Sequence, residues 1–173
     1  LSGSYNPSGK LSVTFPQSTG ACPCYYNTPS TGRPGGKSKF TSKYLDIPLE
    51  PVYSFGHGLS YTNYEYSDLQ VEILEDNLKV SVEVKNTGQM SGEETVQIYI
   101  QDVIAKRVRP VRELKNYKKA ILEKDESKKV EFIIPTKELG YYDNNMNYIV
   151  EEGKFKIYVG GSLKECLETE VNL

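Results

Sequence analysis

A period-two alternation of apolar and polar side chains dominates the sequence after residue 65 and restricts its possible folds most strongly. Apolar residues occupy every second position over 69–73 and 78–84, on either side of a polar turn at 75–77. Because successive side chains of a strand point to opposite faces of its sheet, this spacing predicts a hairpin with one buried face. Further strands are expected at 96–100, 113–122, 130–134, 147–150, 155–159 and 167–171.

Seven or eight strands within about 110 residues, with no helical pattern between them, predict an antiparallel β-sandwich. An antibody-type sandwich is not expected, because the sequence has no tryptophan and its cysteines are not placed to bridge two central strands. A fibronectin type III-like arrangement fits better over residues 62–173. Four strand aromatics fit its alternating core, namely Tyr99, Phe132, Phe155 and Tyr158.

The first 61 residues have a different composition. They hold seven of the nine prolines and eight of the fourteen glycines, but only seven charged residues. Alternation over 10–15 predicts a single strand that ends at Pro16, because proline lacks the amide donor. Residues 17–51 show little periodicity, and their aromatics predict a long ordered loop packed on a larger body. We expect residues 1–61 to be part of an incomplete domain, and residues 62–173 to be a whole one.

Charge and hydropathy argue against two classes of partner. Residues 1–61 carry five basic and two acidic side chains, and residues 62–173 carry sixteen and twenty-one, for a net charge of −2. Such a chain has no strong basic field, so neither nucleic acid nor an anionic membrane is expected as a partner. No apolar run approaches the roughly 18 residues of a membrane span.

The three cysteines are expected to be free thiols. Cys22 and Cys24 are separated by one residue, Cys166 is distant, and no second cysteine pair or histidine cluster completes a zinc site. Free thiols slightly favour the cytoplasm over secretion. The compartment stays open, because a missing signal peptide is uninformative in a fragment. No metal and no cofactor are expected.

No residue of this chain is assigned a catalytic role. His57 is the only histidine, and its glycine neighbours favour a structural position in a tight turn, with a place in a ligand cleft as the alternative. The adjacent acids at 93–94, 125–126 and 151–152 are expected at solvated strand ends. They are not expected to face one another across a cleft, as glycosidase carboxylates do.

A basic cluster follows the third expected strand, over residues 106–112. It contains Arg107, Arg109 and Arg112, without the interleaved aromatics on which nucleic-acid bases stack. We expect these arginines to pair with acidic groups of a neighbouring domain, since interdomain interfaces are polar.

Several motifs in sequence order resemble the closing region of glycoside hydrolase family 3 enzymes. They are Asn-Pro-Ser-Gly-Lys-Leu-Ser-Val-Thr-Phe-Pro at 6–16, Tyr-Tyr-Asn at 25–27, Thr-Gly-Arg-Pro at 31–34 and Phe-Gly-His-Gly-Leu-Ser-Tyr-Thr at 55–62. Downstream, the stretches 109–115, 141–143 and 153–162 resemble the fibronectin type III-like domain that ends many of these enzymes. The likeness covers nearly the whole chain.

The resemblance implies a retaining β-glycosidase whose chemistry lies upstream. In that family a (β/α)8 barrel supplies an aspartate nucleophile, and an α/β sandwich domain often supplies a glutamate acid/base. Neither motif can be matched here, so the resemblance implies a non-catalytic C-terminal portion whose partners are those two domains. Residues 1–61 would be the final strand and tail of the α/β sandwich domain. The candidate cleft-lining residues are Tyr26, Asn27, Arg33, Phe55 and His57.

The implied substrate is a small β-glucoside or oligosaccharide, with a β-xyloside as the alternative class. Two departures from the family pattern stand out: His57 occupies a position that is often Tyr or Phe, and Cys22-Pro-Cys24 matches no family motif. A stand-alone carbohydrate- or protein-binding module is an alternative function. A homodimer is a further possibility, because the apolar side of 10–15 needs a covering partner. Sugar and linkage specificity stay open.

Overall fold

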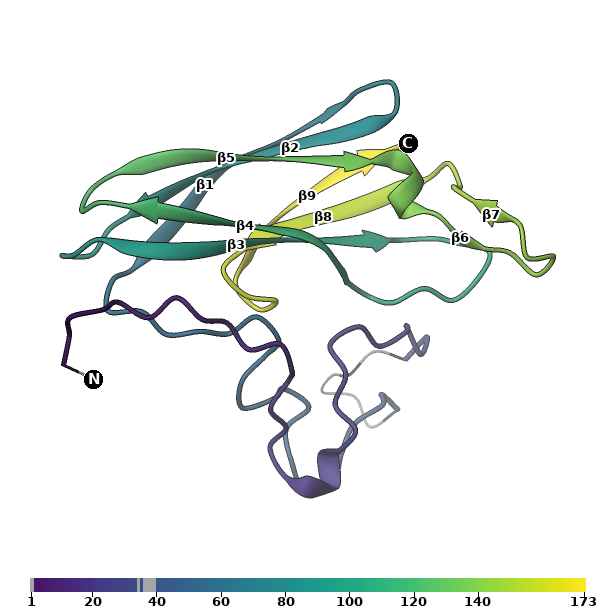
Figure 1. Ribbon diagram of the computed structural model, residues 1–173. Helices are drawn as coiled ribbons and strands as arrows, with labels where there is room; N and C mark the ends of the chain where they lie inside the picture. The colour runs from purple at the N-terminus through teal and green to yellow at the C-terminus, as the bar shows by residue number, and fades with distance from the viewer. Residues whose placement is uncertain (1, 34, 36–39) are drawn as a thin grey trace.

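The computed structural model describes residues 2–33, 35 and 40–173, and its strands all lie after residue 63 (Figure 1). The long strands are β1 (Tyr64–Ile73), β2 (Asn77–Asn86), β3 (Gly92–Asp102), β4 (Glu113–Leu122), β5 (Ser127–Pro135), β8 (Lys154–Gly160) and β9 (Cys166–Asn172). Short elements are the strands β6 (Tyr141–Tyr142) and β7 (Tyr148–Ile149) and the 3-10 turns η1 (Thr19–Ala21) and η2 (Thr136–Leu139).

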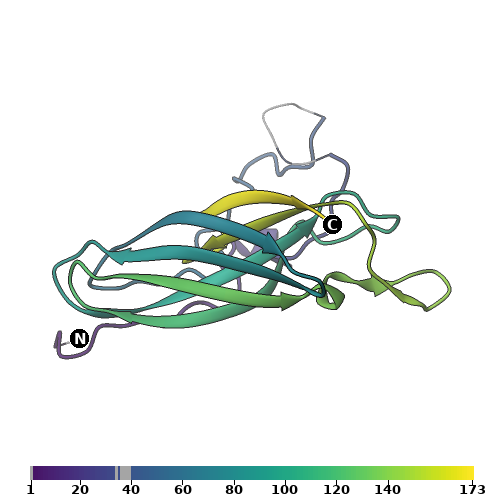
Figure 2. The same ribbon diagram turned by 90° about the horizontal axis from the view of Figure 1, so that it is seen from above.

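Two antiparallel sheets pack face to face, with strand orders β1-β2-β5 and β4-β3-β8-β9 (Figures 1 and 2). A small third sheet of β6 and β7 projects from one end of the sandwich (Figure 2). The alternation explains this layering, because every second residue from Leu78 to Val84 is fully buried between the sheets. The predicted antiparallel β-sandwich is confirmed.

The core between the sheets is made of branched aliphatic side chains and two phenylalanines. β2, β3 and β8 supply most of it, through Val80, Val82, Ile98 and Ile157 among others. The strand aromatics that the sequence assigned to the core are all buried, namely Tyr99, Phe132, Phe155 and Tyr158. Tyr99 and Tyr158 nevertheless lie outside the core cluster between the sheets, because their contacts are on the other face of the four-stranded sheet.

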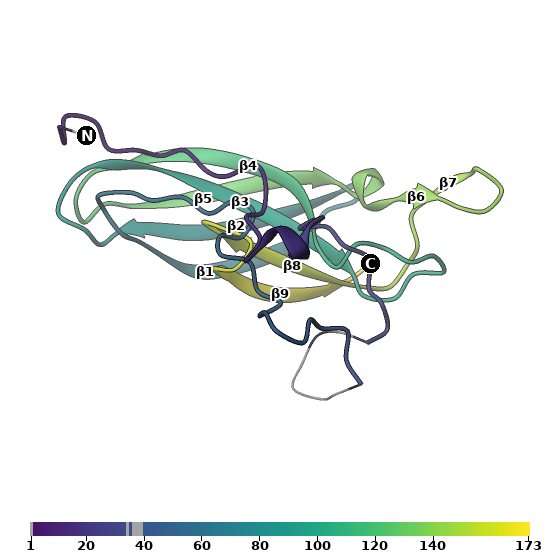
Figure 3. The same cartoon turned by 90° about the horizontal axis from the view of Figure 1, so that it is seen from below.

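Strand β3 is buried on both of its faces. Val96, Ile98 and Ile100 point into the core, whereas Gln97 and Tyr99 are buried on the outer face. That outer face is covered by two extended segments, residues 6–15 and 53–62, which run side by side beneath the sheet (Figures 1 and 3). We call these two segments the strap. The strap therefore places the first 62 residues against the sandwich.

The strand expected at 10–15 does not form. The chain bends at residues 12–13, so pairing with the other strap segment occurs at two separate points. Leu11 exchanges backbone hydrogen bonds with Gly56 and His57, and Phe15 forms an isolated bridge with Tyr53. Val13 and Phe15 are about half exposed, and the Phe15 ring meets that of Tyr53 edge-on. The sequence alternates as a strand would, but the segment has no partner with which it forms a continuous ladder of backbone hydrogen bonds.

The long loop at 17–51 contains no strand in its described parts, in agreement with its lack of periodicity. It touches the sandwich through an isolated bridge between Pro29 and Pro110, and the amide of Val111 donates to the carbonyl of Thr28 over 2.9 Å. Not all of its aromatics are buried, because Tyr25 and Phe40 are largely exposed. Within the ranges described, no helix is long and apolar enough to cross a membrane.

Candidate functional site

The junction between strap and sandwich is organised by Gln97, a polar residue in the middle of β3. Its side-chain amide donates to the carbonyls of Gly161 at 2.6 Å and Gly56 at 3.2 Å, and its Oε1 accepts from the Tyr99 hydroxyl at 2.5 Å. Gln97 is 3% exposed. Because these partners come from the strap, from β3 and from the turn after β8, one side chain fixes three parts of the chain.

Polar side chains of the strap bind the start of β3. Asn6 donates to the carbonyl of Ser91 at 2.9 Å, and the Ser8 hydroxyl donates to Glu93 at 2.9 Å. Lys10 forms a salt bridge with Glu94 over 3.2 Å. Three contacts in sequence order therefore run along residues 91–94, at and just before the start of β3, so the strap has a defined register on the sheet.

The expectation that the acids at 93–94 are solvated is wrong for Glu94. This residue is 4% exposed, and its carboxylate accepts hydrogen bonds from the Tyr66 hydroxyl at 2.8 Å and from Lys10. Burial and the neighbouring Glu94 carboxylate raise the pKa of Tyr66 far above its ordinary value. The physical reason for the error is the strap, which brings a lysine to a position that the strand alone would leave in water.

Two of the candidate cleft residues, Tyr26 and Phe55, are packed against each other. The rings of Tyr26 and Phe55 stack at 4.1 Å between centroids, and each meets the ring of Tyr99 edge-on at 6.4 Å. The Tyr26 hydroxyl also accepts a hydrogen bond from the amide of Leu114 at 3.4 Å. These contacts fix the loop to the outer face of the four-stranded sheet.

His57 lies inside the strap, and its ring stacks on that of Tyr53 at 4.9 Å. Its backbone carbonyl accepts from Leu11 at 2.8 Å, and its amide donates to Ser54 at 3.1 Å. The Nε2 atom is buried and has no hydrogen-bonding partner among the described residues, and the same is true of the Thr14 hydroxyl. Gly56, just before His57, has a positive φ of +78°, which explains the need for glycine at this turn.

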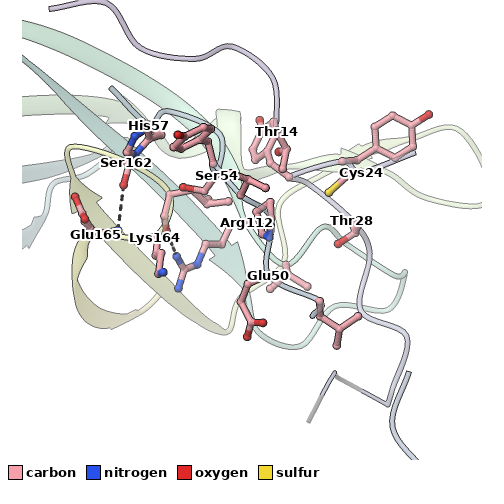
Figure 4. A pocket seen from close by; sticks show the side chains of 18 residues that line it. Thr14, Cys24, Thr28, Glu50, Ser54, His57, Arg112, Ser162, Lys164 and Glu165 are labelled. Atoms are coloured by element: carbon pink, nitrogen blue, oxygen red, sulfur yellow. Dashed lines mark hydrogen bonds between the residues drawn. The ribbon is translucent and has the colours of Figure 1, made fainter. Parts of the chain in front are cut away.

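A cavity of about 600 Å³ opens where the strap, the long loop and the sandwich meet (Figure 4). Thr14, Tyr53 and His57 line it from the strap, and Arg112 and Glu165 line it from the sandwich. The remaining lining residues are Cys24, Tyr25, Tyr26, Thr28, Leu49, Glu50, Pro51, Val52, Ser54, Val111, Ser162, Leu163 and Lys164. The described chain thus places a cavity with mainly apolar walls where the strap, the long loop and the sandwich meet.

Arg112 is held at the wall of this cavity by the sandwich itself. Its guanidinium lies 3.8 Å from the centroid of the Tyr158 ring and donates to the carbonyl of Leu163 at 2.5 Å. Burial raises the pKa of the nearby Cys166 thiol to about 11, against the opposing effect of Arg112. Cys166 is therefore a poor thiolate nucleophile at neutral pH.

The other two arginines of the basic cluster bind the end of the sandwich that carries β6 and β7. Arg107 donates to the carbonyl of Tyr142 at 2.7 Å. Arg109 forms a salt bridge with Glu113 over 3.0 Å and lies 4.9 Å from the centroid of the Tyr141 ring. Burial alone would raise the pKa of Glu113, but Lys115 and Arg109 together hold it below its ordinary value. These arginines therefore have partners within this chain.

Of the remaining candidates, only Cys24 lines the cavity. Asn27 and Arg33 are exposed on the long loop, and neither lines the cavity. Cys22 and Cys24 are free thiols, and no group of three or more potential metal ligands occurs among the described residues. Pro34 of the Thr-Gly-Arg-Pro motif lies outside the described residues.

Sequence reasoning missed Gln97, Lys164 and Glu165. Gln97 could have been noticed, because it is the one polar residue in the otherwise apolar run 96–100. No sequence pattern marked Lys164 and Glu165 as cavity residues, because charged residues after a glycine-rich turn are ordinary solvated groups. Their place in the cavity depends on the long loop folding back against them.

The comparisons with known proteins first define a class. A family model for the fibronectin type III-like domain matches residues 94–163, which run from β3 to the turn after β8. Together with the two antiparallel sheets, this match defines the sandwich as a fibronectin type III-like domain, as the sequence predicted.

The similarity to known proteins extends beyond that domain to the strap and the loop. The periplasmic β-glucosidase of Salmonella typhimurium is 42% identical over 167 residues, covering 92% of this chain and 22% of that protein. The thermostable β-glucosidase B of Acetivibrio thermocellus is 40% identical and covers 98% of this chain and 24% of its own length. A crystal structure of a β-glucosidase from Listeria innocua with gluconolactone superposes with a TM-score of 0.93 at 42% identity, over 99% of this chain and 25% of that chain.

This chain belongs to glycoside hydrolase family 3 and corresponds to the C-terminal part of its β-glucosidase relatives. It spans about a quarter of the length of the relatives it matches. Putative β-xylosidases also occur among its relatives, such as one from Formosa agariphila at 38% identity.

Proposed function

We propose that this chain holds together the catalytic body of a retaining β-glycosidase that hydrolyses terminal β-glucosyl residues. The observation that carries the proposal is the likeness to β-glucosidases over 92–99% of this chain, which continues through the strap and the loop. A fibronectin type III-like domain alone would match only the sandwich. The strap is therefore the part that links the sandwich to the rest of the parent enzyme.

The contacts of the strap support a rigid rather than a flexible connection. Hydrogen bonds and a salt bridge join Asn6, Ser8 and Lys10 to β3, and Gln97 binds the strap from the sheet side. A flexible linker would be solvated and free of such contacts. On this proposal residues 1–61 complete the α/β sandwich domain of the parent, and the fibronectin type III-like domain, residues 62–173, braces them from outside.

The proposed cleft residues then divide into two roles. Asn27 and Arg33 are exposed and stay available to line a substrate cleft. Tyr26 and Phe55, which stack on each other, would act by fixing the loop that carries them, and His57 by holding the turn. Arg107, Arg109 and Arg112 would contribute to the interdomain interface through whatever donors their present partners leave free.

The substrate class is tested by comparing the parent enzyme with this chain alone on aryl β-glucosides and aryl β-xylosides. We expect hydrolysis of the glucoside by the parent, a lower kcat/KM on the xyloside, and no hydrolysis of either by residues 1–173. Activity of this chain alone would refute the proposal that the nucleophile and the acid/base lie upstream. A higher kcat/KM on the xyloside would reassign the substrate.

Homodimer formation is a second proposal, and it rests on exposed apolar side chains of the strap. Val13, Phe15, Tyr53 and Leu59 are each about half exposed or more, on a segment that is otherwise anchored. Such groups commonly mark an interface. Light scattering of the parent enzyme should show twice the monomer mass, and a monomer would reject this part of the proposal.

A further inference from the structure

The cavity at the junction has the composition of a binding site for a small neutral ligand. Its volume of about 600 Å³ lies within the range of ligand pockets, which is roughly 300–1,000 Å³. Aromatic rings of Tyr25, Tyr26 and Tyr53 contribute to the wall, and hydroxyl-bearing Thr14 and Ser162 lie deeper, where they are buried. Apolar ring faces combined with a few polar groups are typical of pockets that fix the orientation of a ligand.

Charged side chains around this cavity are balanced in sign but are not paired. Glu50, Arg112, Lys164 and Glu165 all line it, and Figure 4 shows them around the same opening. None of the four forms a salt bridge with another described residue. Two cations and two anions give the wall no net charge, so neither an anionic nor a cationic ligand is favoured overall. A ligand with both donors and acceptors could bind each of them.

Two buried polar atoms near the cavity have no hydrogen-bonding partner among the described residues. The Thr14 hydroxyl and the His57 Nε2 are buried without a hydrogen-bonding partner within the described chain, and both residues line the cavity. Buried polar atoms are nearly always satisfied by protein, water or ligand. Small side-chain movements at the wall would let a hydroxylated ligand, or the water it orders, satisfy them.

We propose that this cavity is a non-catalytic saccharide site that takes a neutral mono- or disaccharide at the junction of strap and sandwich. Tyr53 would pack against the sugar ring, and the unpaired rim charges Lys164 and Glu165 would bind its hydroxyl groups. The site goes beyond the proposed bracing function, because it adds ligand binding at a place that the exposed cleft candidates Asn27 and Arg33 do not line, although Tyr26 and His57 do. Its binding is weak, with a dissociation constant on the order of 1 mM for a ligand of this size.

The experiment is a ¹H–¹⁵N NMR titration of the full 173-residue chain with glucose, cellobiose and laminaribiose. We expect saturable shifts at the amides of Ser54, Ser162 and Leu163, with a dissociation constant on the order of 1 mM. Lys164→Met and Glu165→Gln are exposed and unpaired, so they should fold normally and weaken binding about threefold to tenfold each. Lys124→Met and Glu152→Gln make the same chemical changes away from the cavity and should leave the constant unchanged.

Three results would overturn the saccharide site. They are shifts that stay linear up to about 100 mM sugar, equal affinity in the cavity and control variants, and saturable shifts confined to the exposed tyrosines of β6 and β7.

A second arm uses the parent enzyme with its upstream nucleophile replaced, in a calorimetric titration. A stoichiometry of two sugars per chain that falls to one in the Lys164→Met, Glu165→Gln double variant would support the site. A stoichiometry of one sugar per chain in both proteins would reject it. Because hydrolysis by the intact parent is measured separately, failure here leaves the proposed function unaffected.

Discussion

The environment of the Glu94 carboxylate depends on the contact between the strap and the sandwich. Its side chain is 5% exposed, and that of its partner Lys10 is 18% exposed. A buried carboxylate that loses its partner retains the full penalty of desolvation, whereas a lysine near the surface can reach water again. The two halves of this ion pair therefore contribute unequally to stability.

Lys10→Met should destabilise the chain by about 2–4 kcal/mol, because it leaves Glu94 buried and unpaired. Glu94→Gln should cost about 1–2 kcal/mol, since Lys10 can turn toward solvent. The double variant should cost less than the sum, with a coupling of at least about 1 kcal/mol. Urea unfolding of the four proteins measures these differences.

The exposed pair of Lys79 and Glu131 provides the matched control. Its side chains are 35% and 43% exposed, so Lys79→Met should cost under about 1 kcal/mol. Equal losses from Lys10→Met and Lys79→Met would show that the strap does not bury the Glu94 carboxylate in solution.

Glu151 makes the end of the sandwich that carries β6 and β7 sensitive to acid. Hydrogen bonds from Tyr141 and from Lys106, backbone and side chain, lower its pKa from 4.5 to about 2. A lowered folded-state pKa means that this contribution to stability is complete above about pH 4.5 and is lost as the pH falls toward 2. The stability difference between wild type and Glu151→Gln should therefore be constant near neutrality and shrink over that interval.

Urea unfolding at several pH values tests the role of Glu151, with Glu152→Gln as the control for loss of a neighbouring charge. A difference between wild type and Glu151→Gln that stays the same down to pH 2 would contradict the assigned hydrogen bonds.

Among the elements, the strands were predictable and the strap was not. Alternation at 78–84 depends on burial of one face, which the hairpin itself provides, so the sequence reports it directly. At 10–15 the same pattern formed no strand, because the segment pairs with 53–57 only at two points. The cavity combines side chains about a hundred residues apart, and no local pattern carries that information.

Gly56 tests the fit between the strap and β3. A Cβ added there would lie 2.1 Å from Gln97 Oε1, and the φ of +78° at Gly56 also disfavours any residue other than glycine. Gly32 has a similar φ of +71° but nothing within 4 Å of an added Cβ. Gly32→Ala should therefore show the backbone cost alone, about 1–2 kcal/mol.

Gly56→Ala should cost about 1–3 kcal/mol more than Gly32→Ala, because the buried Gln97 side chain must move. Thermal and urea unfolding of both variants measure the difference. Equal losses would mean that Gln97 can rearrange freely, and would remove it as the organiser of the junction.

For the molecule as a whole, the strap and the sandwich pack against each other even though their compositions differ. The relatives retain both parts together, over 92–98% of this chain. The outer face of β3 explains the association: Tyr99 is fully buried only because Tyr26 and Phe55 cover it. A division of the chain at residue 61 by composition therefore cuts through a packed interface.

Removal of residues 1–61 should consequently expose an apolar face on an otherwise intact sandwich. Uncovering Tyr99 and its neighbours, together with loss of the Gln97 hydrogen bonds, should lower the free energy of unfolding by at least about 3 kcal/mol. The fragment 62–173 should also bind a hydrophobic dye and self-associate. A chain that begins at residue 6 retains the strap and should match the full chain, because the described residues that it loses, 2–5, are exposed. If 62–173 were as stable as the full chain and remained monomeric without binding dye, the strap would be an accessory segment, and the rigid brace proposed for the parent enzyme would have no structural basis.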